Sequence, residues 1–72
     1  MVSLTPRQRQ VISHLARGHS NLEVAAALGI SPRTAKAHTD EIRRRLGVAK
    51  RRQILYAYFV ETGELPLEAE AG

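Results

Sequence analysis

The sequence predicts an all-α fold: a compact domain of four helices with a central helix-turn-helix, formed by helices two and three, and a fourth helix that dimerises. Two observations support this prediction. Capping residues and glycines divide residues 1–63 into four segments with helical periodicity. No segment alternates polar and apolar residues with the period of two that indicates a half-buried strand. Residues 64–72 are predicted to be an acidic, flexible tail.

The first predicted helix begins at Thr5 and ends at Gly18. Thr5 stands at the N-cap position, Pro6 at the first helical position, and Gln8 three residues after the cap, which together form a capping box. The apolar residues that follow lie on one helix face: Val11, Ile12, Leu15 and Ala16.

The second and third predicted helices are separated by only three residues. A capping box of Ser20 and Glu23 starts the second helix and Gly29 ends it. Its inner face is predicted to hold Leu22, Val24, Ala25 and Leu28. Ala25 is small enough to let the next helix cross closely, so these two helices are expected to form the helix-turn-helix.

The third predicted helix starts with Ser31 and Pro32 and ends at Gly47. At 3.6 residues per turn, one face forms a stripe directed at the core: Ala35, Thr39, Ile42 and Leu46. The opposite face carries mostly charged residues: Arg33, Lys36, Ala37, Asp40 and Arg44.

The fourth predicted helix runs from about Lys50 to Thr62, and Gly63 ends it. It is apolar or aromatic around its whole circumference over residues 54–60, and one face, Ile54, Ala57 and Tyr58, suffices to pack on a small core. Three apolar residues are left over and predict a dimer interface: Leu55, Tyr56 and Phe59. The helix has no good N-cap, and its first cations oppose the helix dipole, which suggests that they have another use.

Composition narrows the functional classes. With 72 residues and no cysteine, the chain has room for one small domain without disulfides or a thiolate metal site. The longest apolar run has seven residues, whereas a membrane span needs about 20. With no signal peptide recognised either, a soluble, cytoplasmic protein is expected. All eleven lysines and arginines lie within residues 7–52, beside only three acidic residues, which indicates a polyanionic partner.

A basic helix-turn-helix is typical of proteins that place their second helix in the major groove of double-stranded DNA. Four residues of the outer face are predicted to read bases: Arg33, Lys36, Ala37 and Asp40. Arg33 and Lys36 can donate to guanine, the Ala37 methyl can contact thymine, and the Asp40 carboxylate can accept from cytosine N4. Arg44 and Arg51 are predicted to contact phosphate, as are the helix N-termini at Ser20 and Ser31.

The sequence predicts no catalytic site, cofactor, metal or small-molecule site. His14, His19 and His38 lack the spacing of metal ligands, the serines lack a nucleophile-elbow context, and no glycine-rich phosphate loop is present. The three aromatic residues cluster in the fourth helix rather than along the basic surface, which argues against a platform for single strands or RNA.

Four stretches give the chain a family resemblance: "LTPRQRQVI", "LARGHSNLEVAAALGIS", "TAKAHTDEIRRRLGV" and "RRQILYA". Over about residues 4–63 it resembles the LuxR/GerE-type DNA-binding domain of bacterial transcription regulators. The resemblance implies that the third helix reads DNA, that the fourth often forms a two-fold dimer, and that Lys36, Ala37 and Asp40 occupy base-contact positions. It also implies phosphate-binding or bracing roles for four further residues: Ser20, Asn21, Thr34 and His38.

The sequence departs from the family pattern in two ways. Ala35 and Thr39 stand where valine is usual, which predicts a less filled core under the third helix, at a cost of about 1–2 kcal/mol per lost valine side chain. Asp40 is acidic where a basic or neutral residue is common, which predicts weaker attraction to phosphate.

The function predicted from these observations is a sequence-specific regulator of transcription that binds an inverted DNA repeat as a homodimer. Two other functions stay open: a promoter-recognition domain like that of a sigma factor, and a module that binds another regulator or RNA polymerase through the fourth helix. The Leu-Gly-Val turn and the aromatic fourth helix argue against the sigma-factor alternative. The chain suits both a free-standing regulator and the effector end of a longer one.

Overall fold

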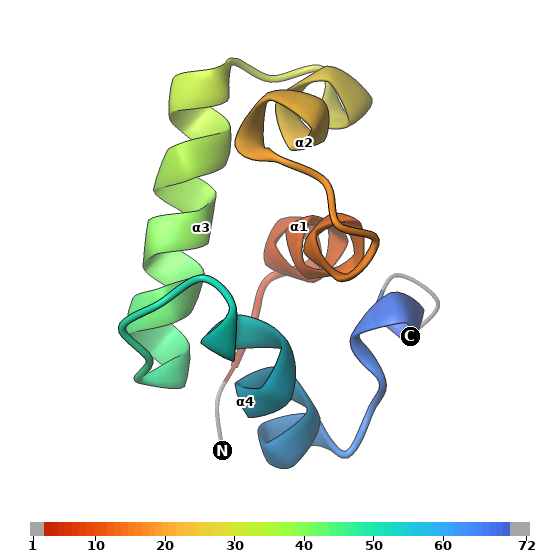
Figure 1. The fold of residues 1–72 in the computed structure, drawn as a ribbon, viewed down its shortest axis with the longest axis vertical. Helices are drawn as coiled ribbons and strands as arrows, with labels where there is room; N and C mark the ends of the chain where they lie inside the picture. Colours follow the sequence, from red (N-terminus) through yellow and green to blue (C-terminus); the bar gives the residue numbers. More distant parts are fainter. Residues whose placement is uncertain (1–2, 70–72) are drawn as a thin grey trace.

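The computed structural model describes residues 3–69, and in this range it contains helices and no strand. The elements are α1 (Pro6–Ala16), α2 (Asn21–Leu28), α3 (Pro32–Leu46), α4 (Gln53–Thr62) and a single turn of 3-10 helix, η1 (Pro66–Glu68). In Figure 1, α1 is seen nearly end-on in the middle, with α3 along one side, α2 above it and α4 below. The predicted all-α fold with a central helix-turn-helix is therefore confirmed.

Side-chain caps begin the first three helices where the sequence predicts them. The Thr5 hydroxyl accepts from the Gln8 N–H (3.1 Å) while Gln8 Oε1 accepts from the Thr5 N–H (2.9 Å). Ser20 and Glu23 form the same reciprocal pair at the start of α2. At the C-terminal ends of α2 and α3, Gly29 (φ 68°) and Gly47 (φ 70°) adopt the left-handed conformation, which a side chain would strain.

The core lies between α1, α3 and α4, with α2 packed on α3. The fully or nearly buried apolar residues are Val11, Ile12, Leu15, Val24, Ala25, Ala35, Ile42, Ile54, Tyr58 and Ala69. The predicted stripe of α3 is buried at Ala35, Thr39 and Ile42. The prediction of Leu22 as a core residue is wrong, because Leu22 is 68% exposed. At about 100° per residue, Leu22 points to nearly the opposite side of α2 from the fully buried Val24.

Helix α4 begins later than predicted. Its first residue is Gln53, and residues 50–52 form a turn instead of helix. Gln53 Oε1 accepts from the N–H groups of Ala49 (3.1 Å) and Lys50 (2.8 Å), so this side chain satisfies donors that precede the helix. The three cations at 50–52 therefore lie in the turn before α4 rather than inside its first turn.

The C-terminal segment, residues 64–69, differs from the predicted flexible tail. It folds back over α1, where Arg9 donates from Nε to the Ala69 carbonyl and pairs through Nη2 with Glu64 Oε1, both at 3.0 Å. The buried Tyr58 hydroxyl donates to the same Glu64 oxygen (2.8 Å). Burial, and then this bond to a carboxylate, raises the pKa of Tyr58. Residues 70–72 of the predicted tail lie outside the described residues.

Candidate nucleic-acid interface

The helix-turn-helix is held together by close packing and by one polar contact between its helices. Ala25 on α2 and Ala35 on α3 are both buried, which brings the two helices close together. The Thr39 hydroxyl donates within hydrogen-bonding range of the Ala35 carbonyl (3.1 Å) and of Asn21 Oδ1 (3.3 Å). Asn21 thus braces the start of α2 against α3, one of the two roles that the family resemblance implies for it.

The residues predicted to read bases lie together on the outer face of α3. Arg33, Lys36 and Ala37 are exposed, and Asp40 is half-buried one turn further on. They point away from the stripe that packs into the core, so their side chains are available to a ligand that lies along the helix. The structure therefore brings this predicted set together on one surface.

Asp40 is held by two cations of its own helix. Lys36 Nζ lies 3.0 Å from Asp40 Oδ2, and Arg43 donates through Nη2 to Asp40 Oδ1. Hydrogen bonds from Arg43 and then from Lys36 lower the pKa of Asp40 from its ordinary value. Arg43 also donates through Nη1 to the Ala49 carbonyl (2.9 Å), which ties α3 to the turn before α4.

A second carboxylate on α3 has the same arrangement. Glu41 accepts from Arg44 through Oε1 and from Arg45 Nε through Oε2 at 3.2 Å. The guanidinium of Arg45 also donates to the Ser3 carbonyl (3.0 Å). The side chain of Arg44, a predicted phosphate ligand, remains 75% exposed despite its pairing.

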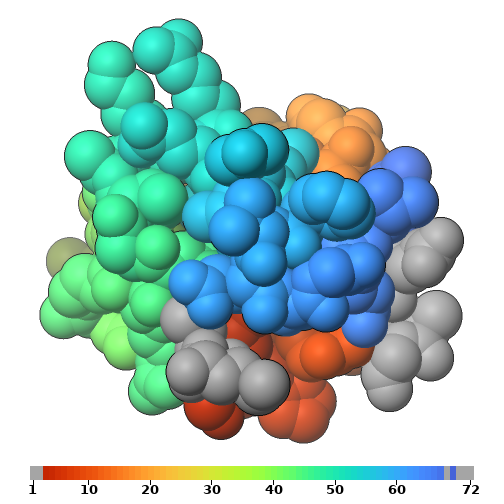
Figure 2. Space-filling view, turned by 90° about the horizontal axis from the view of Figure 1, so that it is seen from below, coloured from red at the N-terminus to blue at the C-terminus, as the bar shows by residue number. Residues whose placement is uncertain are grey.

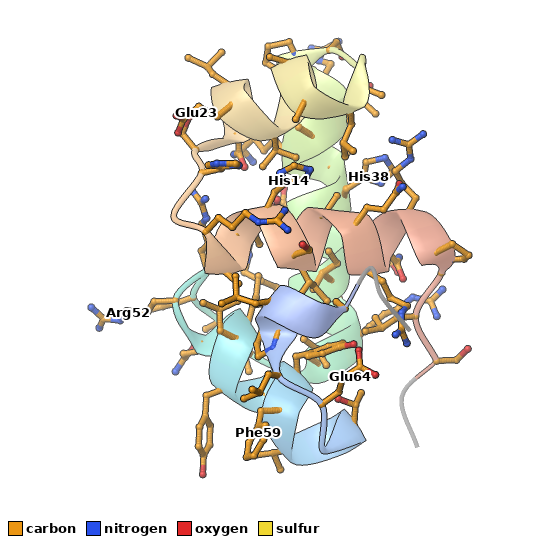
Figure 3. The ribbon with its side chains drawn as sticks, turned by 90° about the vertical axis from the view of Figure 1, so that its right-hand side faces the viewer. His14, Glu23, His38, Arg52, Phe59 and Glu64 are labelled. Carbon is orange, nitrogen blue, oxygen red and sulfur yellow. The ribbon has the colours of Figure 1, made fainter. Side chains whose placement is uncertain are left out.

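The start of α2 lies next to the turn before α4, although the two are distant in sequence. Arg51 donates to the carbonyl of His19, the residue before the Ser20 cap. A shallow groove of about 640 Å³ joins the two segments; it is lined by Leu15, Gly18, Ser20, Lys50, Arg51, Arg52 and Leu55. Figure 3 shows Arg52 extending outward from this side of the fold. Two predicted phosphate ligands, Ser20 and Arg51, thus share one basic groove.

The sequence predicts that the N-terminus of α2 at Ser20 binds phosphate through free N–H groups. The N–H of Ser20 itself is not free. It donates to Glu23 Oε1 at 2.8 Å, completing the capping box. This backbone hydrogen bond, followed by that with the Ser20 hydroxyl, lowers the pKa of Glu23. The Ser20 hydroxyl, in turn, accepts from the Glu23 N–H. A phosphate bound by Ser20 would therefore compete with the hydrogen bonds between Ser20 and Glu23.

The other two predicted phosphate or bracing residues lie on α3. The Thr34 hydroxyl accepts from the Ser31 hydroxyl at 2.9 Å, so Thr34 belongs to the cap of the recognition helix and is exposed. His38 is half-buried on α3. The structure places both residues on the candidate recognition helix itself.

The contact between His14 and His19 was not predicted from the sequence. The rings of His14 and His19 stack with centroids 5.2 Å apart, and their Nδ1 atoms lie 3.0 Å from each other, so one ring donates to the other. The five-residue spacing does not indicate this pairing, because it depends on how the chain turns back at Gly18. Within residues 3–69 no group of three or more potential ligands is placed to hold a metal ion.

The apolar face predicted on α4 is present and extends beyond the helix. Tyr56 is 75% and Phe59 44% exposed, whereas Leu55 is half-buried against the core. Three exposed apolar neighbours extend the face beyond the predicted residues: Val60, Leu65 and Leu67. A shallow groove of about 430 Å³ runs between the helix and the C-terminal segment; it is lined by Ala16, Leu55, Tyr56, Phe59, Leu65, Pro66 and Leu67. From below, α4 and the C-terminal segment form one face (Figure 2).

In the described part of the chain, no helix has the length and apolar character needed to cross a bilayer. No solved structure gave a significant match.

Known proteins similar to this chain are regulators. YhjB of Escherichia coli is 49% identical over 51 residues, covering 71% of this chain and 26% of YhjB. The uncharacterized transcriptional regulatory protein YhcZ of Bacillus subtilis is 46% identical over 50 residues, covering 69% of this chain and 23% of YhcZ. The transcriptional regulatory protein UhpA of Escherichia coli is 46% identical over 46 residues, or 64% of this chain and 24% of UhpA. The chain thus spans about a quarter of the length of each of these three relatives.

The family model GerE, described as bacterial regulatory proteins of the luxR family, matches residues 2–57. This range contains α1, α2, α3 and the start of α4, and therefore the whole helix-turn-helix. The predicted resemblance is confirmed, as is the prediction that the chain is not an enzyme, because the family and its members are regulators. The chain belongs to the luxR family of bacterial regulatory proteins and carries its helix-turn-helix domain.

Proposed function

We propose that this domain binds double-stranded DNA sequence-specifically, with α3 in the major groove. The observation that carries the proposal is the outer face of α3, where Arg33, Lys36, Ala37 and Asp40 lie together opposite the packed stripe. A groove about 12 Å wide admits such a helix, and these side chains offer donors, a methyl group and an acceptor to base edges. Lys36 and Arg33 read guanine, Ala37 contacts thymine, and Asp40 accepts from cytosine.

Phosphate contacts supply affinity and orientation rather than sequence information. We assign this role to two groups of residues. Arg51 and Ser20 share one basic groove, with Asn21 next to Ser20 at the start of α2, and Arg51 donates to the carbonyl of His19 there. Arg44, Thr34 and His38 flank the reading face on α3. A regulator that binds the chromosome also acts in the cytoplasm, the location that the sequence predicts.

We further propose that two copies associate through α4 and bind an inverted repeat. The exposed side chains of Tyr56 and Phe59, beside the partly exposed Leu55, form an apolar surface of the kind that marks an interaction site. Two-fold symmetry of such a dimer would be matched by two-fold symmetry of the DNA site. The same surface favours a second candidate partner, another regulator or RNA polymerase, because its groove continues onto the C-terminal segment.

Replacing Phe59 with aspartate is expected to convert the dimer into monomers. Phe59 is 44% exposed and is not a core residue, so the change adds a charge to the apolar face without emptying the core. Sedimentation velocity of the free protein and of its DNA complex measures the change. Leu22→Asp is the matched control, since Leu22 is 68% exposed on α2, which does not touch α4. A Phe59→Asp protein that sediments as the wild-type dimer would rule out this interface.

A pool of random duplexes tests the proposed function directly. The protein is incubated with the pool at two salt concentrations, and the retained duplexes are sequenced. Enrichment of an inverted repeat, with affinity that falls steeply as salt rises, supports a dimeric DNA reader. Retention without enrichment contradicts sequence-specific reading by this domain alone. No retention at low salt contradicts DNA binding altogether and favours the protein partner.

A further inference from the structure

We propose that Asp40 is a counter-ion built into the reading face of α3, which withholds Lys36 from phosphate and so suppresses binding to non-cognate DNA. The inference rests on the proposed function and concerns how the same surface discriminates between duplexes. Asp40 is then more than a base acceptor. It determines specificity through the penalty that it imposes on wrong sites.

The geometry fits a carboxylate shared by two cations. Lys36 and Arg43 lie four residues before and three residues after Asp40, spacings that bring side chains together on a helix. Each cation uses a different oxygen, Oδ2 for Lys36 and Oδ1 for Arg43. The carboxylate is therefore engaged at both oxygens before any ligand arrives.

The two cations are held to different degrees. Arg43 is 31% exposed in its side chain and donates its other Nη to the Ala49 carbonyl, so it is anchored in the fold. Lys36 is 68% exposed, and its contact is an ordinary surface ion pair, a weak interaction that a competing ligand can open. Asp40 therefore keeps Arg43 and can release Lys36.

The other carboxylate of α3 is also paired with two cations. Glu41 pairs with Arg44 and Arg45, so four of the five cations of α3 are matched by its two carboxylates. These ion pairs reduce the attraction of α3 for a polyanion below what its five cationic residues alone would give. A polyanion that approaches it must displace these carboxylates from their cations or accept their repulsion.

Cognate and non-cognate duplexes then differ in whether they offer Asp40 a hydrogen-bond donor in place of Lys36. At a base pair with an amino group in the major groove, such as cytosine N4, the carboxylate exchanges Lys36 for a new donor, and Lys36 becomes free to reach a guanine. Elsewhere Lys36 leaves for phosphate and Asp40 faces a negative surface with one cation fewer. The ion pair thus makes non-specific binding less favourable and leaves cognate binding nearly unchanged.

Asp40→Asn tests this inference, with Glu41→Gln as the matched control on the same helix. Both changes remove one carboxylate and alter the net charge equally. The affinities of the wild type and of both variants are measured for the selected duplex and for a scrambled duplex, across a salt series. Circular dichroism establishes that the helices are retained in each variant.

For Asp40→Asn we expect binding to the scrambled duplex to tighten about 3- to 10-fold at low salt, and the slope of log affinity against log salt to steepen by about one unit, as for one additional phosphate contact. The ratio of specific to non-specific affinity should fall. Glu41→Gln should tighten binding to both duplexes alike and leave that ratio unchanged. Asp40→Ala should repeat the fall, which would attribute it to the lost carboxylate rather than to new contacts of the amide.

The two proposals fail in different ways. If the wild type selects a duplex but Asp40→Asn changes neither the ratio nor the salt slope, or changes them only as Glu41→Gln does, the counter-ion role is overturned and DNA binding stands. If neither the wild type nor the variants bind any duplex at low salt, the proposed function fails and this inference falls with it.

Discussion

Replacing Lys36 with alanine is expected to weaken binding to the cognate duplex by about 10- to 100-fold, because a good contact to a guanine edge is worth about 1–3 kcal/mol of discrimination. Lys36 is exposed on the outer face of α3, and its ion pair is with Asp40 of the same helix. No core contact is lost with it, so the free energy of unfolding should change by less than about 0.5 kcal/mol.

Fluorescence anisotropy with the selected duplex, and with duplexes altered one base pair at a time, measures this effect. The loss should be accompanied by relaxed selectivity at one position of each half-site. Arg44→Ala is the matched control: as a phosphate ligand, it should weaken binding to all duplexes similarly and reduce the salt slope by about one unit. Unchanged affinity of Lys36→Ala for the cognate duplex would remove α3 from its role as recognition helix.

The local structure of this chain could be predicted from the sequence because its signals are local. The capping boxes of Thr5 and Ser20 each involve residues three apart, and these hydrogen bonds form as predicted. Gly29 and Gly47 end their helices in the left-handed conformation. The buried stripe of α3 follows from helical periodicity alone.

Part of the candidate site also follows from helical spacing. The residues of the outer face of α3 share one surface because 3.6 residues per turn fixes which residues share a face. The same spacing brings Lys36 and Arg43 within reach of Asp40, although neither ion pair is among the predictions from the sequence. Their roles toward DNA bases and phosphates remain predictions.

Contacts between distant segments could not be predicted in this way. Arg51 reaches His19 across 32 positions, and Arg9 reaches Glu64 across 55. Whether an arginine pairs or remains in solvent depends on how helices meet, which neither charge nor periodicity encodes. The start of α4 illustrates a related limit, because Gln53 caps donors that precede its own helix. Lys50 has no side-chain acceptor with which to complete a capping box, so its sequence gives no capping signal.

The C-terminal segment offers the largest expected effect on stability. A chain that ends at Gly63 is expected to lose about 2–4 kcal/mol of free energy of unfolding. It loses the hydrogen bond of the Tyr58 hydroxyl, worth about 1–3 kcal/mol when its partner is removed, and the burial of Ala69 against α1. For a domain of this size the melting temperature should fall by roughly 10–25 °C, since about 1 kcal/mol corresponds to 4–8 °C.

Thermal and urea unfolding of the full chain and the shortened chain measure this loss, and point variants separate its causes. Glu64→Ala removes the acceptor of both Tyr58 and Arg9 while retaining the rest of the segment, so it should account for about 1–3 kcal/mol. Glu61→Ala, an exposed residue of α4, is the control and should change stability by less than about 0.5 kcal/mol. If the shortened chain melts with the full one, residues 64–69 contribute no stability and the domain ends at Gly63, as the sequence predicts. If Glu64→Ala alone reproduces the whole loss, the segment acts through one carboxylate that joins α1 to α4.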